Sequence, residues 1–338
     1  MTQPLITVLM PVYNAAPYLA EAIDSILNQR FKDFEFLIIN DGSTDNSLEI
    51  INSYKDKRIL LINNGQNIKL IATLNKGIEL AQGKYIARMD ADDISLPERL
   101  EKQVQFMETH PEVGLCGSFV RTVGLAKNYD VHYACSHDEI KFNLFFDTHF
   151  PHPAAFIRKS VLSENNLKFD FGFIHAEDFE LWNRMAQHTR LAILPEILVH
   201  KRVHPEQISV KYTPIQLEVS SKIRRQLIKN LGIEPTDKEI LLYDNFLEQN
   251  IPKEKMDVIV LLNFLDKLIK GNTKKKVYNA SLFNNYFAQR YWDICTKSTY
   301  CGLNIYYLYF CSEASKIKSP SKILKIKFFL KALFRYGY

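Results

Sequence analysis

The chain has 338 residues, of which 46% are hydrophobic and 24% charged, so it is long enough for two domains of ordinary globular composition. It contains no run of about 18 uncharged apolar residues, so we expect no membrane-spanning helix, and its first residues lack the pattern of a signal peptide. The five cysteines include no C-x-x-C pair, which argues against a zinc or disulfide framework and favours a reducing, cytoplasmic location.

The net charge of +5 is unevenly distributed along the chain. Residues 315–338 hold seven basic residues and no acidic one, whereas residues 1–314 hold 36 basic and 38 acidic residues. The basic character therefore belongs to the C-terminal tail, and we expect no nucleic-acid-binding face on the rest of the protein.

Strand and helix patterns alternate through the first half of the chain. Strands are predicted at residues 5–10, 34–39, 59–62, 85–89, 113–120, 154–157 and 191–194. Helices are predicted at residues 17–27, 48–54, 71–81, 97–107 and 176–185. Ser43 or Thr44 is expected to cap the second of these helices. The spacing of about 25 residues is typical of βαβ units, so the sequence predicts an α/β fold with a mostly parallel sheet flanked by helices.

The fourth predicted strand ends in three carboxylates within four positions, namely Asp90, Asp92 and Asp93. Carboxylates this close repel one another and resist ionising together unless a cation lies among them. Hard divalent ions such as Mg²⁺ or Mn²⁺ bind carboxylates together with substrate phosphates. The alternative is an acidic turn that simply opens the next helix.

Two other polar loops favour the metal interpretation. Tyr13 and Asp41 also follow predicted strands, and right-handed crossovers bring the ends of parallel strands to one crevice. The chain has neither a G-x-G-x-x-G fingerprint nor a P-loop, so a metal rather than a glycine-rich loop would neutralise the phosphates.

The rest of the chain changes character. Residues 125–150 lack periodicity and are expected to form loop and short helix near the pocket mouth. Beyond them, long helical patterns cover residues 215–230, 237–249, 256–269 and 282–294. We therefore divide the chain into a domain of residues 1–213 and a helical C-terminal region of residues 214–338.

The tail forms a basic amphipathic pattern if residues 321–335 are helical. Lys327, Lys331 and Arg335 then share one stripe, and the apolar side chains share a broad opposite face made by Ile323, Ile326, Phe329, Leu330 and Leu333. This composition favours a helix lying on anionic lipid, so residues 315–338 predict a peripheral membrane contact. The alternatives are packing on a partner protein or on the chain's own domain. The apolar segment 300–311 is too short to span a bilayer.

Six short motifs occur in a fixed order. They are residues 8–14 (VLMPVYN), 39–45 (INDGSTD), 74–77 (LNKG), 89–93 (MDADD), 176–178 (AED) and 202–204 (RVH). Through them, residues 5–210 resemble family 2 of the inverting glycosyltransferases, which have the GT-A fold. Residues 85–103 are especially similar to bacterial enzymes that build capsule, exopolysaccharide and lipopolysaccharide O-chains.

The resemblance implies a nucleotide site made of Pro11, Tyr13, Asn14, Asp41, Lys69 and Asp90. In it, Tyr13 would stack on the base and Asp41 would accept the imide N–H of uracil or thymine. Asp92 would be a direct ligand of Mn²⁺ or Mg²⁺, with Asp90 near the ribose and the metal waters and His204 close to the diphosphate and metal. Asp93 is interpreted as a cap of the following helix, with metal coordination as the alternative.

The resemblance also implies that Asp178 is the catalytic base and that Glu177 orients the base or the acceptor. The alternative is that both acidic residues stabilise a helix N-terminus. His152 and Trp182 are candidate acceptor contacts, with a core role as the alternative for Trp182. A zinc site at His149 and His152 is not expected, because the intervening proline breaks the helix that would bring them together.

Together with these patterns, the resemblance implies an inverting, metal-dependent transferase that moves a sugar from a nucleoside diphosphate sugar, UDP-linked, to a saccharide or lipid-linked saccharide acceptor. The expected setting is surface polysaccharide synthesis at the cytoplasmic face of the inner membrane. One alternative is a sugar nucleotidyltransferase, although residues 11–16 lack the glycine- and lysine-rich loop of that class. Another is a catalytically idle scaffold of a polysaccharide assembly, which the presence of Asp90, Asp92 and Asp178 argues against.

Overall fold

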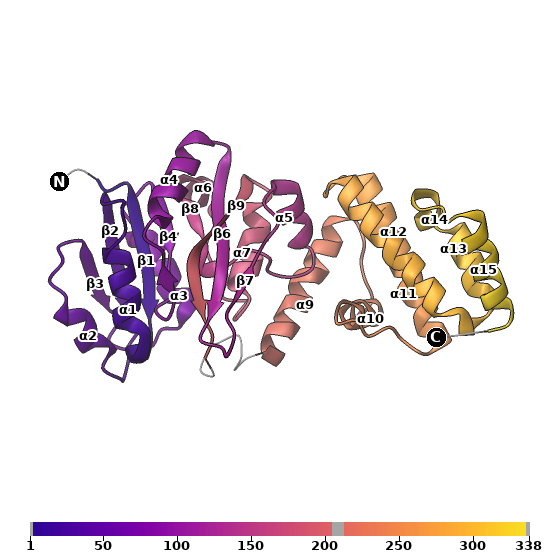
Figure 1. Cartoon of the computed structure of the whole chain (residues 1–338), viewed down its shortest axis with the longest axis horizontal. Coiled ribbons are helices and arrows are strands. Elements are labelled where there is room, and N and C mark those ends of the chain that lie inside the picture. Colours follow the sequence, from indigo (N-terminus) through magenta and orange to yellow (C-terminus); the bar gives the residue numbers. More distant parts are fainter. Residues whose placement is uncertain (1–2, 205–212, 336–338) are drawn as a thin grey trace. The chain divides into compact units, whose positions relative to one another are not determined.

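The computed structural model describes residues 3–204 and 213–335. The chain divides into two compact units, Met1–Ser220 and Ser221–Tyr338 (Figure 1). This division falls inside helix α9 (Thr213–Asn230).

The described part of the first unit is built on one nine-stranded sheet with the order β3-β2-β1-β4-β8-β6-β9-β5, and β7 pairs with β6. The strands are β1 (Ile6–Val12), β2 (Phe34–Asn40), β3 (Ile59–Asn63), β4 (Tyr85–Arg88), β5 (Ile94–Ser95), β6 (Val113–Val123), β7 (Tyr129–Val131), β8 (Phe156–Arg158) and β9 (Arg190–Arg202). Strands β1 to β4 are parallel, as are β6 and β9, whereas β5, β7 and β8 run antiparallel to their neighbours. The predicted α/β fold with a sheet flanked by helices is confirmed, and the sheet is mixed, with four parallel and four antiparallel pairings.

Strand β1 lies at the centre of the parallel part and pairs with β2 on one side and β4 on the other. Because the carboxyl ends of parallel strands meet at one edge, the loops after these three strands lie along the same edge of the sheet. Those loops carry Tyr13, Asp41 and the acidic residues after β4.

Helices pack on this sheet and bury its apolar side chains. They are α1 (Ala16–Leu27), α2 (Ser47–Ser53), α3 (Leu70–Leu80), α4 (Arg99–Thr109), α5 (His137–Asn143), η1 (His152–Ala154), α6 (Lys159–Glu164) and α7 (Glu177–Met185). The apolar stripe of α1 joins one core cluster with alternate residues of β1 and β2. Helix α3 comes so close to β1 that a Cβ on Gly77 would lie 2.3 Å from a methyl carbon of Leu9, so a larger residue at this position of the LNKG motif would displace the buried Leu9 side chain.

Strand β9 is much longer than the predicted strand at residues 191–194. The pattern stops at Pro195, but in the structure Ser118 pairs with Leu194 and Phe119 with Ile197, so a bulge accommodates the proline. The strand then continues to Arg202 and pairs with β5. It thereby carries the RVH motif to the loop after β4.

Two further local predictions need correction. Residues 125–150 contain not only loop and the short helix α5 but also strand β7. The predicted cap of α2 by Ser43 or Thr44 is wrong, because α2 begins at Ser47 with Asn46 at the N-cap position. The Oγ atom of Ser43 instead accepts the N–H of Asn14 at 3.0 Å, which joins the loops after β1 and β2.

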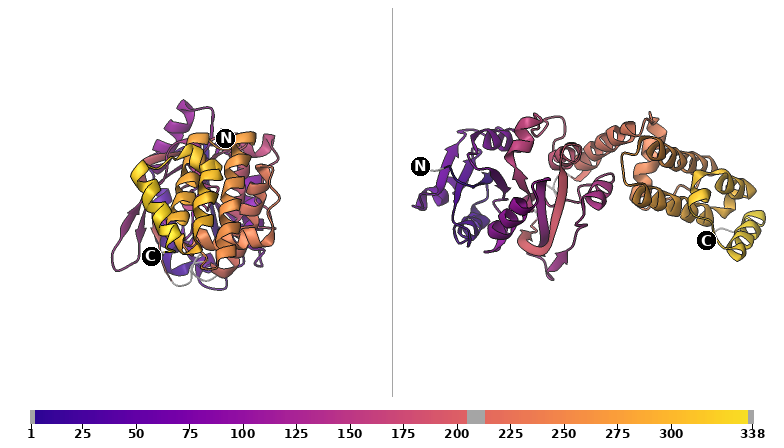
Figure 2. Two further views of the ribbon diagram at one scale, coloured as in Figure 1. Left: turned by 90° about the vertical axis from the view of Figure 1, so that its right-hand side faces the viewer. Right: turned by 90° about the horizontal axis from the view of Figure 1, so that it is seen from above.

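The second unit is helical, and Figure 2 shows its long helices α11 and α12 packed side by side. After α9 follow α10 (Asp237–Leu247), α11 (Lys255–Lys275), α12 (Ala280–Lys297), η2 (Thr299–Cys301), α13 (Leu303–Cys311), α14 (Glu313–Ile317) and α15 (Lys322–Leu333). Within the described residues, none of the helices has the length and apolar character needed to cross a membrane.

Helix α15 ends earlier than the helix predicted for residues 321–335. Arg335 lies beyond its last residue with a φ of 55°, so Arg335 does not continue the stripe of Lys327 and Lys331. Residues 336–338 of the predicted membrane contact lie outside the described residues.

Candidate active site

The loops after β1 and β2 hold each other in place. Asn14 adopts a φ of 51°, a left-handed conformation that asparagine tolerates well, and its Oδ1 accepts the N–H of Thr44 at 2.8 Å. The neighbouring Tyr13 is 50% exposed. The structure thus presents an exposed aromatic ring at the carboxyl edge of the sheet, where it can stack on a planar ligand.

Asp41 is only 3% exposed and follows β2 directly. One carboxylate oxygen accepts the N–H of Ile68 and the side-chain amide of Asn64, both at 2.9 Å, and the other accepts the N–H of Lys69 at 3.0 Å. A carboxylate has about four acceptor positions, so these three donors fix its orientation and leave one position for a further donor.

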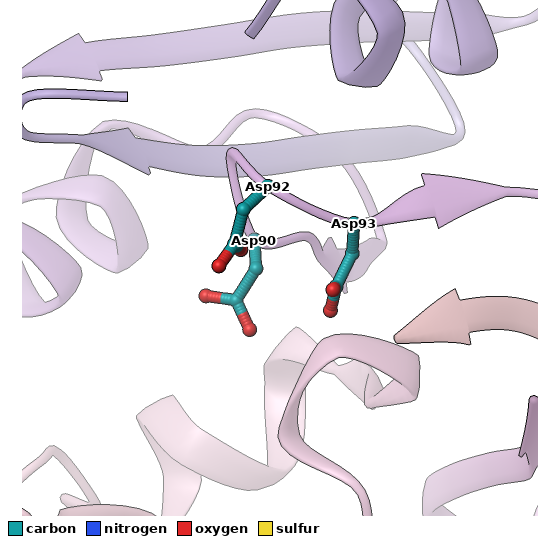
Figure 3. Close-up of side chains that lie close together, drawn as sticks. All are labelled: Asp90, Asp92 and Asp93. Atoms are coloured by element: carbon teal, nitrogen blue, oxygen red, sulfur yellow. The ribbon is translucent and has the colours of Figure 1, made fainter. Parts of the chain in front are cut away.

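The loop after β4 gathers Asp90, Asp92 and Asp93 (Figure 3). One oxygen of each side chain lies within 4.8 Å of one oxygen of the other two. Burial and then the charge of Asp90 raise the pKa of Asp92, and burial with Asp90 and Asp92 raises the pKa of Asp93 well above its ordinary value. The group is therefore electrostatically strained, and a cation among the oxygens would relieve the repulsion.

Hydrogen bonds join the end of β9, and His204 just beyond it, to this acidic loop. The His204 Nε2 atom lies 2.9 Å from an Asp92 carboxylate oxygen, and the backbone N–H of Arg202 donates to Asp93 at 2.8 Å. The Arg202 Nε atom also donates to the Asp92 carbonyl at 3.0 Å. The interpretation of Asp93 as a helix cap is wrong, because α4 begins only at Arg99 with Glu98 at its N-cap.

Arg88 is a buried charge at the end of β4 that forms an ion pair with Asp90. Its positive charge also lowers the pKa values of Asp178 and Glu177, against the larger opposite effect of burial. The same charge adds to burial in lowering the pKa of His152. A single guanidinium is thus electrostatically coupled to the acidic loop and to the start of α7.

Glu177 and Asp178 begin α7, and both carboxyl groups have raised pKa values. Burial raises the pKa of Asp178 to about 6, and burial followed by the charge of Asp178 raises that of Glu177 to about 7. The N–H of Phe179 donates to Asp178 at 2.7 Å. Carboxyl groups that titrate near neutral pH are suited to take up a proton during a reaction.

His152 lies beside Asp178, with its Nδ1 atom 4.0 Å from an Asp178 oxygen. Burial lowers the pKa of His152 well below its ordinary value, so the imidazole is neutral. The ring contacts the buried Trp182 edge-on at 5.9 Å between centroids. In the described part of the chain, neither the His152 Nε2 atom nor the Trp182 indole N–H has a hydrogen-bond partner. Packing rather than hydrogen bonding therefore holds the His152 ring against Trp182 of α7.

Comparison with known proteins decides the family. The model of the family described as Glycosyl transferase family 2 matches residues 7–165. An uncharacterized glycosyltransferase of Haemophilus influenzae is 36% identical over 242 residues, which cover 67% of this chain and 73% of the relative. The O-antigen biosynthesis glycosyltransferase WbnJ of Escherichia coli is 32% identical over 241 residues, covering 68% of this chain and 91% of WbnJ. The chain belongs to glycosyl transferase family 2.

Solved structures support the same fold for this glycosyltransferase. Residues 1–349 of S. aureus TarS in complex with UDP-GlcNAc superpose with a TM-score of 0.56 and 16% identity, covering 94% of this chain and 93% of that one. The mannosyltransferase PcManGT from Pyrobaculum calidifontis in complex with GDP-Man and Mn²⁺ gives a TM-score of 0.54 and 16% identity, covering 86% and 81%. At such low identity the likeness concerns the fold alone, and the expected GT-A fold is confirmed.

The glycosyltransferase brings several of the predicted site residues into contact. Asp90, Asp92 and His204 meet at the acidic loop, while Asp178, Glu177, His152 and Trp182 form a second group around the start of α7. Pro11, Tyr13, Asn14, Asp41 and Lys69 belong to β1 and the loops after β1, β2 and β3. The roles expected for these residues remain predictions.

Sequence reasoning missed Arg88 and Arg202. Arg202 stood within the RVH motif but had no role assigned, and its contacts with Asp92 and Asp93 join segments about 110 positions apart. Arg88 did leave a signal, because it is a charged side chain inside a strand whose residues are all buried. Such a residue is unfavourable unless it is paired, so it points to a nearby carboxylate.

Replacement of Arg88 by Met is expected to lower kcat about 100-fold, because Asp90 loses the partner that orients it. The pKa of Asp178 should also rise without this charge, so the acidic limb of the pH–rate profile should move to higher pH. Arg88→Lys keeps the positive charge. Its kcat should fall, but the acidic limb of its pH–rate profile should stay at the wild-type pH. Arg121→Met, which breaks an exposed ion pair with Asp130, is the matched control and should change neither. An unmoved acidic limb in Arg88→Met would contradict this coupling.

The wild-type pH profile provides a second test. A base must be ionised to accept a proton, and the raised pKa values of Asp178 and Glu177 lie at about 6 and about 7. The rate of sugar transfer should therefore rise with pH across the range of these pKa values and be lost at lower pH. Circular dichroism should show that the protein stays folded over the same range. Full activity at pH values near the ordinary carboxyl pKa of 3.8 would exclude these groups as the base.

Proposed function

We propose that this family 2 glycosyltransferase is an inverting, metal-dependent enzyme. It moves a sugar from a nucleoside diphosphate sugar, UDP-linked, to a hydroxyl of a saccharide or lipid-linked saccharide in surface polysaccharide synthesis. The observation that carries the proposal is the coupling of the acidic loop to the base candidate Asp178 through Arg88. The name of the relative WbnJ, an O-antigen biosynthesis enzyme, supports the polysaccharide setting.

The donor site is proposed at the edge that follows β1, β2 and β4. Tyr13 stacks on the base, and the remaining acceptor position of Asp41 takes the imide N–H of uracil. Pro11, Asn14 and Lys69 shape the surrounding loops, and Asp90 lies toward the ribose. The complex of TarS with UDP-GlcNAc supports a nucleotide-sugar donor for a protein of this fold.

The residues of the acidic loop fit a divalent cation. Asp90 and Asp92 offer carboxylate oxygens, the ligands that Mg²⁺ and Mn²⁺ prefer. The raised pKa values of Asp92 and Asp93 reflect burial and repulsion between neighbouring carboxylates, which a bound cation would offset. His204 adds a nitrogen beside Asp92. When bound, the cation would supply charge that compensates the leaving diphosphate. The Mn²⁺ in the complex of PcManGT supports this assignment.

Asp178 performs the proton transfer in the proposed reaction. Its carboxylate takes the proton of the acceptor hydroxyl as that oxygen attacks C1 of the sugar, on the face opposite the diphosphate. The C1–oxygen bond to the diphosphate breaks as the new bond forms, so one displacement inverts the configuration. Glu177 keeps the base oriented, and the neutral His152 and the Trp182 ring bound the acceptor side.

The acceptor is proposed to reach the enzyme at a membrane. Helix α15 exposes apolar side chains beside lysines, which supports a peripheral contact through residues 315–338. The cysteines of the chain are all free, which supports a reducing compartment and hence the cytoplasmic face of the inner membrane.

A donor screen tests the proposed function. Purified protein is incubated with a panel of UDP- and GDP-sugars and Mn²⁺, and release of the nucleoside diphosphate is followed with and without EDTA. We expect turnover of a UDP-sugar that EDTA abolishes. Release of pyrophosphate from UTP and a sugar phosphate would instead indicate a nucleotidyltransferase, and absence of any turnover or nucleotide binding would favour the idle scaffold.

A further inference from the structure

The helical unit contains a pocket of about 650 Å³ at which α12, η2 and α15 meet the segment before α11. Its lining includes the four lysines Lys253, Lys297, Lys327 and Lys331, and it contains no aspartate or glutamate. Aromatic rings of Trp292 and Phe328 form part of the wall. All of these residues belong to Ser221–Tyr338, so the pocket lies within one compact unit.

The lysines give the pocket the chemistry of an anion site. Lys253, Lys297 and Lys327 are exposed, and in the described part of the chain none of the three forms an ion pair with a carboxylate. Four lysines around one pocket, with no acidic residue in its lining, favour a ligand with concentrated negative charge, such as a phosphate. The aromatic wall adds an apolar surface, so the ligand that fits best carries both a phosphate and an apolar body.

Helix α15 supplies the apolar counterpart. Leu324, Lys327, Phe328 and Lys331 recur at intervals of three and four and form the side of the helix that lines the pocket. The adjacent side is apolar and exposed, with Ile323 at 66%, Ile326 at 60%, and Leu330 and Leu333 at 45% each. An exposed apolar helix face next to a row of lysines matches a membrane surface with anionic headgroups.

We infer that the lysine pocket binds the phosphate headgroup of an anionic membrane lipid while the exposed face of α15 inserts among the acyl chains. The inference deepens the membrane contact proposed above and rests on it, but it is independent of sugar transfer. A free phosphate ion satisfies the lysines alone, whereas a lipid also covers the apolar face of α15.

Vesicle co-sedimentation of the full chain tests the site. Vesicles of equal parts phosphatidylcholine and phosphatidylglycerol should bind the protein, and vesicles of phosphatidylcholine alone should not. The pocket variant Lys297→Glu/Lys327→Glu should weaken binding at least about 30-fold, since the loss of each lysine near an anionic surface costs about fivefold. The control Lys274→Glu/Lys275→Glu makes the same charge change at exposed lysines of α11, outside the pocket lining and outside residues 315–338, and should weaken binding by no more than about threefold.

The two variants separate a headgroup site from general attraction. Equal losses of vesicle binding in the two variants would overturn the proposed headgroup site. Unchanged vesicle binding of the pocket variant would overturn it as well. Tryptophan fluorescence provides an independent readout, because Trp292 lines the pocket whereas the other tryptophan, Trp182, is fully buried in the first unit. Anionic vesicles should change it in the wild type but not in the pocket variant. A fluorescence change with inorganic phosphate but none with vesicles would overturn the lipid assignment. Donor turnover in solution should stay the same in both variants, so loss of transfer alone would bear on the proposed function instead.

Discussion

Replacement of Asp178 by Asn is expected to reduce sugar transfer by about 10²–10⁴-fold while donor binding stays intact, because a general base contributes rate enhancement of that size. Asn preserves the shape of the side chain but cannot accept the proton. Transfer is measured as nucleoside diphosphate release in the presence of acceptor, and donor binding by titration calorimetry with Mn²⁺. Asp33→Asn, at an exposed position before β2, is the matched control and should behave as the wild type. Unchanged transfer in Asp178→Asn would exclude this residue as the base.

The same variant should be more stable than the wild type above about pH 6. Burial raises the pKa of Asp178 from its ordinary 3.8 to about 6 in the folded state, so the ionised carboxylate lowers the free energy of unfolding at higher pH. Below pH 3.8 the group is protonated in both states, and the difference between the two proteins should vanish. Thermal unfolding over this pH range checks the sign. A Tm of Asp178→Asn below that of the wild type at pH 8 would show that the carboxylate is stabilised where it lies.

Replacement of Asp92 by Ala is expected to remove both metal-dependent donor binding and transfer, the latter by about 100-fold or more, because the cation supplies several kcal/mol of charge stabilisation. The variant also removes the partner of His204, which lies 2.9 Å away. Binding of Mn²⁺ and of UDP is measured separately, with Asp33→Ala as the control. His204→Ala should have a smaller effect, because the carboxylates of Asp90 and Asp92 remain. Retention of metal binding and activity in Asp92→Ala would refute the assignment of the acidic loop.

The parallel part of the sheet was predictable because its strands are short apolar runs that end at turn residues. Residue order alone places Tyr13, Asp41 and Asp90 after three such strands, and the parallel pairing then puts them at one edge. Strand β9 was not predictable to its full length. Its bulge at Pro195 is stabilised by pairing with β6, which no local pattern reveals.

The acidic loop shows the same limit. A carboxylate before a helix usually caps it, but Asp93 accepts an N–H from Arg202, a residue 109 positions away, and tertiary contact overrides the local preference. The pairing of Arg88 with the half-buried Asp90 likewise depends on the fold, which buries the Arg88 guanidinium beside this carboxylate. In the helical unit, the periodicity predicted the helices but not the pocket, since its lysines come from α12, α15 and the segment before α11.

The anomeric configuration of the released sugar tests the central mechanism most directly. Slow donor hydrolysis, in which water replaces the acceptor, is followed by proton NMR before the free sugar equilibrates. With one base at Asp178 and one displacement at C1, a UDP-α-sugar should first yield the β anomer, and Asp178→Asn should yield almost none. Initial release of the α anomer by the wild type would contradict a single displacement.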